Sequence, residues 1–400
     1  MIDAQVPHSL RIQNKSLVLN IIRVKKEISR AQLAKETGLT RATVSQIVND
    51  LLKDNLIRET GTDSNAMGRK GIHLSFNDAY GYVVGIDLGG TKICLSASDF
   101  NGTILHKHTV RTFESPDKQS FLASFTTAIK HFIHESGLEI GQMKGIGVAS
   151  PGIIDYKNGI IVEGSPNIPD WEETELALIL TETFDVVAVV ENDVRSGLLG
   201  EMTRGKARGV QNAVLISIGT GIGSSIMVDG KIVRGMGNAA GEIGYYLFTP
   251  EQLQKKWTQL GCMESIVSGT GLIAYYQSLT DDQKSPAFKT TADLFKAAKN
   301  GEARAMEMMD IFTDHLAIAI LNLMNTVNPE KIILTGGVSR SAEQFLPRLQ
   351  EWIDTHSFKR TQVEIEVSQL FEDGALYGIS LLAIQAALPE FQMIQQTAMK

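Results

Sequence analysis

The chain has 400 residues, a formal net charge of −7, 43% hydrophobic and 21% charged residues, and two cysteines. Its length predicts two or three domains with sizeable cores, and so few cysteines exclude a disulfide scaffold and indicate a reducing, cytoplasmic location. No apolar run approaches the ~20 residues that a membrane-spanning helix needs, and no secretory signal pattern opens the chain, so we expect no membrane partner.

The charge is unevenly distributed along the chain. Residues 1–76 carry 12 Lys and Arg against 7 Asp and Glu, so the negative charge belongs to the remainder. A basic segment followed by an acidic one indicates that only the first segment meets a polyanion.

This basic segment predicts a helix-turn-helix. Apolar side chains at helical spacing cover residues 14–26. Ser29 and Thr40 can cap two further helices, over residues 30–37 and 41–55, and a glycine between them ends the first of the two. Two short helices joined by such a turn form a helix-turn-helix.

The outward face of the third helix carries small and hydrogen-bonding side chains, which can reach base edges and phosphates in a major groove. Two predicted strands, Leu56–Glu59 and Ile72–Phe76, then flank a polar tip over residues 61–70, which is the arrangement of a winged helix. The alternative is a helical protein-interaction module, but the local basic excess favours DNA. The residues expected to contact DNA are Ser29, Arg30, Thr40, Arg41, Thr43, Ser45, Gln46, Asn49, Arg69 and Lys70.

Three glycine turns follow, each after an apolar strand: Asp87–Lys92, Gly219–Gly223 and Thr335–Val338. Glycine lets the backbone approach a polyanion closely, with its amides pointing into the turn. Each turn alone is typical of an ordinary hairpin. The strand–turn–strand unit near residues 83–95 recurs near 214–228, however, which predicts two related α/β halves.

Together these turns resemble those of the ROK family, named for repressors, open reading frames and kinases, over roughly residues 81–385. The resemblance implies an actin-like, two-lobed α/β sugar-kinase fold with a cleft for sugar and nucleotide. It implies a winged helix-turn-helix domain over residues 1–78, a first lobe over 79–193, and a second over 194–400 for effector binding and oligomerisation. The pattern Thr40–Ser45 is similar to that of the family's xylose-repressor branch.

The resemblance also implies ligand contacts, because carboxylates and amides make several directed hydrogen bonds to a polyol. The implied sugar-binding residues are Asn167, Asn192, Asp193, Glu242, Tyr245 and Glu264. The implied nucleotide-binding residues are Asp87, Gly89, Gly90, Thr91, Lys92, Gly219, Thr220, Gly221, Gly223, Gly336 and Gly337. In kinases of the family, the position of Asp193 is the catalytic base on the phosphorylated hydroxyl.

One departure from the family concerns metal. Zinc-binding members have His at the position of Tyr245 and three cysteines in the following loop, of which only Cys262 remains here. A closed zinc site takes four ligands, so we expect no zinc and no other metal. A helical turn within Pro250–Leu260 is expected to replace the metal loop.

Two functional hypotheses follow. The first is a repressor of carbohydrate-utilisation genes, which binds an inverted-repeat operator as a homodimer or homotetramer and is released by a pentose or hexose in the cleft. The second is an ATP-dependent, glucokinase-like sugar kinase with an added DNA-binding head. We favour the repressor, with no required cofactor, because a helix-turn-helix has no evident use in a pure kinase. ATP with Mg²⁺ belongs to the second hypothesis.

Overall fold

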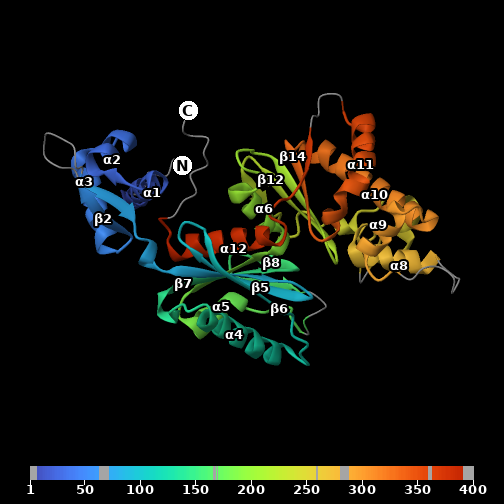
Figure 1. Ribbon diagram of the computed structural model, residues 1–400, viewed down its shortest axis with the longest axis horizontal. Helices are drawn as coiled ribbons and strands as arrows, with labels where there is room; N and C mark the ends of the chain where they lie inside the picture. Colours follow the sequence, from blue (N-terminus) through green and yellow to red (C-terminus); the bar gives the residue numbers. More distant parts are fainter. Residues whose placement is uncertain are drawn as a thin grey trace. The chain divides into compact units, whose positions relative to one another are not determined.

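The computed structural model describes residues 7–62, 72–164, 168, 170–257, 260–279, 288–358 and 363–390. Contacts divide the chain into two compact units, of which the first comprises residues 1–150, 156–190 and 379–400, and the second residues 151–155 and 191–378. Figure 1 shows the elements of each unit. No helix within the described residues is long and apolar enough to cross a membrane. The predicted domain boundaries at residues 78 and 193 stay a prediction.

The N-terminal part of the first unit has the winged helix-turn-helix fold that the sequence predicts. Its helices are α1 (Pro7–Lys25), α2 (Arg30–Thr37) and α3 (Arg41–Lys53), and its strands are β1 (Ile28–Ser29), β2 (Ile57–Thr62) and β3 (Ile72–Phe76). The strands form an antiparallel sheet in the order β1-β3-β2. Strand β2 continues to Thr62, beyond the predicted end at Glu59, across an irregularity between Glu59 and Gly61 that the alternation of side chains did not indicate.

The rest of the first unit is built on a five-stranded sheet in the order β10-β7-β4-β5-β6. The strands are β4 (Tyr82–Leu88), β5 (Lys92–Asp99), β6 (Ile104–Arg111), β7 (Met143–Ser150) and β10 (Val187–Asn192). Figure 1 shows helices α4 (Lys118–Glu135) and α5 (Leu176–Phe184) on one face of this sheet. Two shorter strands are β8 (Ile153–Asp155) and β9 (Ile160–Glu163), and a 3₁₀ turn, η1, spans Asp78–Tyr80.

The second unit repeats this strand order as β15-β14-β11-β12-β13. Its strands are β11 (Ala213–Ile218), β12 (Ile222–Val228), β13 (Lys231–Val233), β14 (Lys331–Thr335) and β15 (Glu364–Val367). Strands β11 and β12 are antiparallel and β11 and β14 parallel, just as β4 pairs with β5 and β7. The predicted recurrence of the strand–turn–strand unit is confirmed.

The helices of the second unit lie between and after these strands. They are α6 (Asp193–Arg204), α7 (Glu264–Val267), α8 (Gly269–Leu279), α9 (Thr291–Lys299), α10 (Ala303–Val327), α11 (Ala342–His356) and the beginning of α12 (Glu372–Ala387). Phe295, Phe312 and Phe345 form a cluster of edge-to-face rings in its core. The expected helical turn after Tyr245 is the short 3₁₀ helix η4 (Pro250–Gln254).

The end of α12 belongs to the core of the first unit. Leu381, Ile384 and Leu388 share one buried cluster with residues of the winged head such as Leu19 and Leu51. Beside this cluster, Nζ of Lys15 lies 2.7 Å from Asp54 and 3.0 Å from Glu390. The C-terminal helix thus completes the core on which the head rests, although more than three hundred residues separate them in the chain.

Candidate functional site

The helix-turn-helix is held by local capping. The Ser29 hydroxyl accepts the Gln32 amide while the Gln32 side chain accepts the Ser29 amide, so α2 begins with a capping box. Gly38 ends α2 in the left-handed conformation at φ 70°. Thr40 then caps α3 by accepting the Thr43 amide at 3.2 Å.

Helix α3 buries its apolar face and exposes its polar one. Val44 and Val48 are fully buried and Ile47 is nearly so. The predicted DNA-contacting residues Arg41, Gln46 and Asn49 are exposed, and Thr43 and Ser45 are half-buried. The helix therefore offers solvent a row of hydrogen-bonding side chains, the surface that base-edge recognition requires.

Arg30 is engaged by its neighbours in this face, which the sequence did not indicate. One terminal nitrogen donates to Oδ1 of Asn49 at 3.3 Å and the other lies 3.4 Å from Glu59. Arg30 thus links α2 to the third helix and to β2. Arg69 and Lys70, also predicted to contact DNA, lie outside the described residues.

In the second unit, the predicted sugar-binding pair lies at the start of α6. Asn192 is the N-cap, and its side-chain oxygen accepts the amides of Val194 and Arg195 at 3.0 and 3.1 Å. Its side-chain nitrogen donates to the Gly152 carbonyl at 3.1 Å. The Asp193 carboxylate accepts the Val194 amide at 2.9 Å. Burial raises the pKa of Asp193, although that amide and the Arg195 guanidinium oppose the shift.

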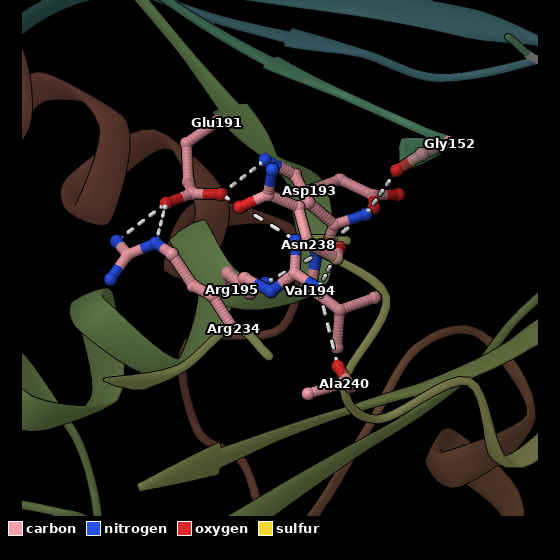
Figure 2. A network of polar contacts seen from close by, with 9 residues as sticks. Gly152, Glu191, Asp193, Val194, Arg195, Arg234, Asn238 and Ala240 are labelled. Carbon is pink, nitrogen blue, oxygen red and sulfur yellow. Dashed lines mark hydrogen bonds and ion pairs between the residues drawn. The ribbon is translucent and has the colours of Figure 1, made fainter. Parts of the chain in front are cut away.

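Three charged residues that sequence reasoning missed surround this helix start (Figure 2). Glu191 and Arg195 are almost fully buried, at 1% and 2% exposure, and Arg234 is partly buried. Arg234 donates to Oε2 of Glu191 through Nε at 3.1 Å and Nη2 at 2.7 Å. The only signal in the sequence was that Glu191 precedes the predicted pair Asn192 and Asp193. The two arginines gave none, because an Arg is mostly solvated.

Arg195 also brings the start of α6 to the loop that carries Glu242. Its Nη2 atom donates to the carbonyls of Asn238 and Ala240 at 2.6 and 3.2 Å. Burial lowers the pKa of Arg195, and the carboxylates of Glu191, Glu242 and Asp193 act against that shift. The Glu242 and Asp193 carboxylates therefore lie within electrostatic range of one guanidinium.

Glu264 and the second glycine turn lie on the same side of the unit. A side chain at Gly221 would collide with the Glu264 carboxylate, and one at Gly223 would press against Val194. Burial raises the pKa of Glu264, and the amides of Gly261 and Ile222 oppose the shift. Strand β12 begins at Ile222, inside the predicted turn Gly219–Gly223, so Gly223 is a strand residue. These contacts join α6, the glycine turn and α7 around one site.

The remaining residues predicted to bind sugar or nucleotide lie on other elements. Tyr245 is 53% exposed at the end of the 3₁₀ turn η3 (Ile243–Tyr245). Gly336 has φ 87°, and a side chain there would collide with the Ile218 backbone at the end of β11. The first glycine turn belongs to the first unit: Asp87 lies within β4 rather than in the turn, and the Thr112 hydroxyl closes the turn by donating to Gly89 at 2.6 Å. Asn167 lies outside the described residues.

Within the part of the chain that the structure describes, no three His, Cys, Asp or Glu residues gather as a metal site would require. Cys262 is buried, and burial raises the pKa of its thiol. The expectation that zinc is not bound stays a prediction.

Comparison with known proteins identifies the family of this site. The model of the ROK family matches residues 83–386. The chain belongs to the ROK family. A model of the MarR family also matches residues 12–65 of this ROK protein, which cover the helix-turn-helix.

Three relatives show how much of this ROK protein is shared. The xylose repressor of Caldicellulosiruptor bescii is 28% identical over 397 residues, covering 96% of this chain and 99% of that protein. The glucokinase of Thermotoga maritima is 31% identical over 311 residues, covering 74% of this chain and 95% of that protein. The crystal structure of a ROK family transcriptional regulator, a homolog of the E. coli MLC protein, has the same fold, with a TM-score of 0.80. The two sequences are 24% identical, and the match covers 96% of this chain and 98% of that one.

Proposed function

We propose that this ROK protein is a sugar-responsive transcriptional repressor. The observation that carries the proposal is the winged head with its exposed polar face on α3, joined to a ROK body. The xylose repressor matches 96% of the chain, whereas the glucokinase matches 74% of it. A helix that exposes Arg41, Gln46 and Asn49 is suited to a major groove.

The effector is a neutral sugar, and the charge of the site supports this choice. Asp193, Glu242 and Glu264 contribute carboxylates, whereas the nearby Arg195 and Arg234 are engaged by Glu191 and by backbone carbonyls. A phosphorylated or acidic sugar would be repelled, but the hydroxyls of a pentose or hexose can donate to the carboxylates. The name of the repressor relative makes D-xylose the first sugar to test.

Sugar binding can release DNA only through a difference in affinity. The sugar must bind the DNA-incompetent state more tightly than the DNA-competent one. A shift from mostly bound to mostly released needs about 5.5 kcal/mol, which hydrogen bonds to several charged groups are able to supply because each contributes about 1.5–3 kcal/mol.

Operator DNA and a second copy of the chain are the proposed partners. A single winged head of this size contacts few base pairs, so useful specificity asks for two heads on an inverted repeat. We accordingly propose a homodimer or homotetramer that acts in the cytoplasm and needs no metal or nucleotide cofactor.

The second candidate function, an ATP-dependent sugar kinase, is favoured by the glycine turns and by Asp193. Phosphoryl transfer needs a positioned base and clamped phosphates. An ATP-consumption assay with D-xylose and D-glucose, beside an electrophoretic shift of DNA upstream of the gene, discriminates the two functions.

The decisive experiment is Asp193→Asn. The variant should bind the operator like the parent protein but should no longer release it with sugar, because the neutral amide replaces a carboxylate acceptor. Asp354→Asn, on the exposed face of α11, is the matched control and should keep the sugar response. Release of operator DNA from Asp193→Asn at the parent's sugar concentration would contradict the role of Asp193. The same variant should lose any kinase activity.

A further inference from the structure

The loop from Arg234 to Glu242 follows strand β13 and carries one of the proposed sugar contacts at its end. Met236 within it is fully exposed, at 105%. Its last part is tied to β12, because the Ser224 amide and hydroxyl both donate to the Gly241 carbonyl, at 3.0 and 2.8 Å. The Ala240 amide donates to the Arg234 carbonyl at 3.0 Å, which closes the loop on itself. Further contacts attach the loop to the rest of the second unit.

Those contacts come from the buried Glu191 carboxylate and the guanidinium groups that it meets. Oε2 of Glu191 accepts both Nε and Nη2 of Arg234, which is the first residue of the loop. Oε1 accepts the Asn192 amide at 2.8 Å and lies 3.8 Å from Nη1 of Arg195. One carboxylate thus connects the end of β10, the first turn of α6 and the start of the loop (Figure 2).

Arg195 provides the second connection. Arg195 lies on α6, two residues after Asp193. Its Nη2 atom donates to the carbonyls of Asn238 and Ala240 in the middle of the loop. A planar guanidinium with several donors in a fixed geometry is suited to hold two carbonyls at once. The loop is therefore attached at its beginning, through Arg234, to Glu191 at the end of β10, and in its middle, through Arg195, to α6.

A purely structural ion pair is the simplest alternative explanation of this network. Burying two guanidiniums and a carboxylate is costly, however, and well-packed apolar residues often give equal or greater stability. This network differs from a simple ion pair in two ways. Arg195 donates to backbone carbonyls of the loop that carries Glu242, and the Glu191 carboxylate accepts the amide of Asn192.

We propose that Glu191, Arg195 and Arg234 are positioning residues of the effector site, which hold the Arg234–Glu242 loop against the first turn of α6 and so set the separation of the Glu242 and Asp193 carboxylates. The inference rests on the proposed function, since it assigns this geometry to sugar binding. Glu191 accepts the Asn192 amide, Arg234 holds Glu191, and Arg195 holds the loop backbone. Their removal should weaken sugar binding without changing the exposed polar face of α3.

The test uses Arg234→Gln in the full-length protein, because Arg234 is partly exposed and its replacement should permit folding. We expect the D-xylose concentration for half-release of operator DNA to rise at least tenfold, while operator affinity without sugar stays within twofold of the parent. Arg234→Lys keeps the charge and one donor to Glu191 but loses the paired geometry, so it should restore part of the response.

Arg348→Gln is the matched control. Arg348 also makes a paired contact, from Nε and Nη2 to the two carboxylate oxygens of Asp314 at 2.9 and 2.9 Å, between α11 and α10 and at a more exposed place. Its replacement should lower stability and leave the sugar response unchanged. Equal loss of the sugar response in Arg234→Gln and Arg348→Gln would show a general effect of stability and would overturn the proposal, as would an unchanged response in Arg234→Gln.

Hydrogen exchange separates failure of this inference from failure of the proposed function. If neither D-xylose nor D-glucose releases operator DNA from the parent protein, the proposed function fails for these sugars. Backbone amides of residues 235–241 should still exchange faster in Arg234→Gln than in the parent or in Arg348→Gln. Unchanged exchange in that segment would overturn the positioning role by itself.

Discussion

Helix α3 of the winged head and helix α6 of the second unit both begin at a side-chain cap and carry an arginine in the first turn, but this arginine is exposed in α3 and buried in α6. Arg41, the first residue of α3, is exposed, whereas Arg195, the third residue of α6, is 2% exposed. Thr40 caps α3 with one hydrogen bond, and Asn192 caps α6 with two.

The difference shows how one local pattern serves two tasks. An exposed polar face costs little in folding and is available to a partner such as DNA. A buried polar turn carries a desolvation cost that its hydrogen bonds must offset, and in return its groups are held in one geometry. Substitutions in α3 should therefore change recognition, and substitutions around α6 should change stability and the sugar response.

The largest expected effect tests the buried side of this comparison. Glu191→Ala leaves the guanidiniums of Arg195 and Arg234 without their carboxylate and should destabilise the protein by about 3–5 kcal/mol. Asp50→Ala, which removes the exposed partner of Arg11, should cost less than about 1 kcal/mol. Urea denaturation measures both values. Similar losses of unfolding free energy in the two variants would contradict the contrast between a buried charge at α6 and an exposed one at α3.

The next effect tests the exposed side. Arg41→Ala should weaken operator binding by about 1–3 kcal/mol, because a guanidinium can make paired hydrogen bonds to a base edge. Its thermal unfolding should match that of the parent protein. Lys53→Ala removes an exposed positive charge at the other end of the same helix and should have a smaller effect. Operator affinity unaltered by Arg41→Ala would refute the assignment of α3.

A smaller effect compares the caps themselves. Loss of a side-chain cap typically costs about 0.5–2 kcal/mol. Asn192→Ala should lie at the upper end, because Asn192 is buried and also bonds to Gly152, and Thr40→Ala at the lower end. Chemical denaturation of the two variants decides the order, and the reverse order would mean that burial does not strengthen the α6 cap.

The last effect concerns pH. Burial raises the pKa of Asp193, so the folded state binds this proton more tightly than the unfolded state. The stability contributed by Asp193 should fall as the pH rises from about 3.8, the ordinary pKa of an aspartate, through the raised pKa. Asp193→Asn should remove this loss and make the protein more stable than the parent at neutral pH.

Asp314 provides a comparison of opposite sign. Burial favours the protonated form, but hydrogen bonds from Arg348 and Trp352 outweigh it and lower the pKa of Asp314. Its contribution should be present at neutral pH and lost as the pH falls through the lowered pKa, so Asp314→Asn should destabilise the protein at neutral pH. Denaturation curves between acid and neutral pH that moved in the same direction for both variants would contradict this assignment.

Much of the fold follows from local patterns. The predicted bounds of α2 agree with the structure, because Ser29 and Gly38 determine the helix ends through short-range hydrogen bonds and backbone conformation. The candidate site was predictable only in part. Asp193 and Glu264 were expected from their motifs, and their sugar-binding roles stay a prediction. The contacts of Arg195 were not expected, because its partners at Asn238 and Ala240 lie more than forty residues away.

The sequence by itself determined the winged helix-turn-helix, the repeated strand–turn–strand units and the polar face of α3, since each depends on neighbouring residues in the chain. The tertiary structure alone decided that Glu191 meets Arg234 and that the end of α12 completes the core beneath the head. Composition and spacing do not reveal such contacts. Whether a charged side chain is solvated or buried depends on which distant segment covers it, and that is decided only when the chain packs.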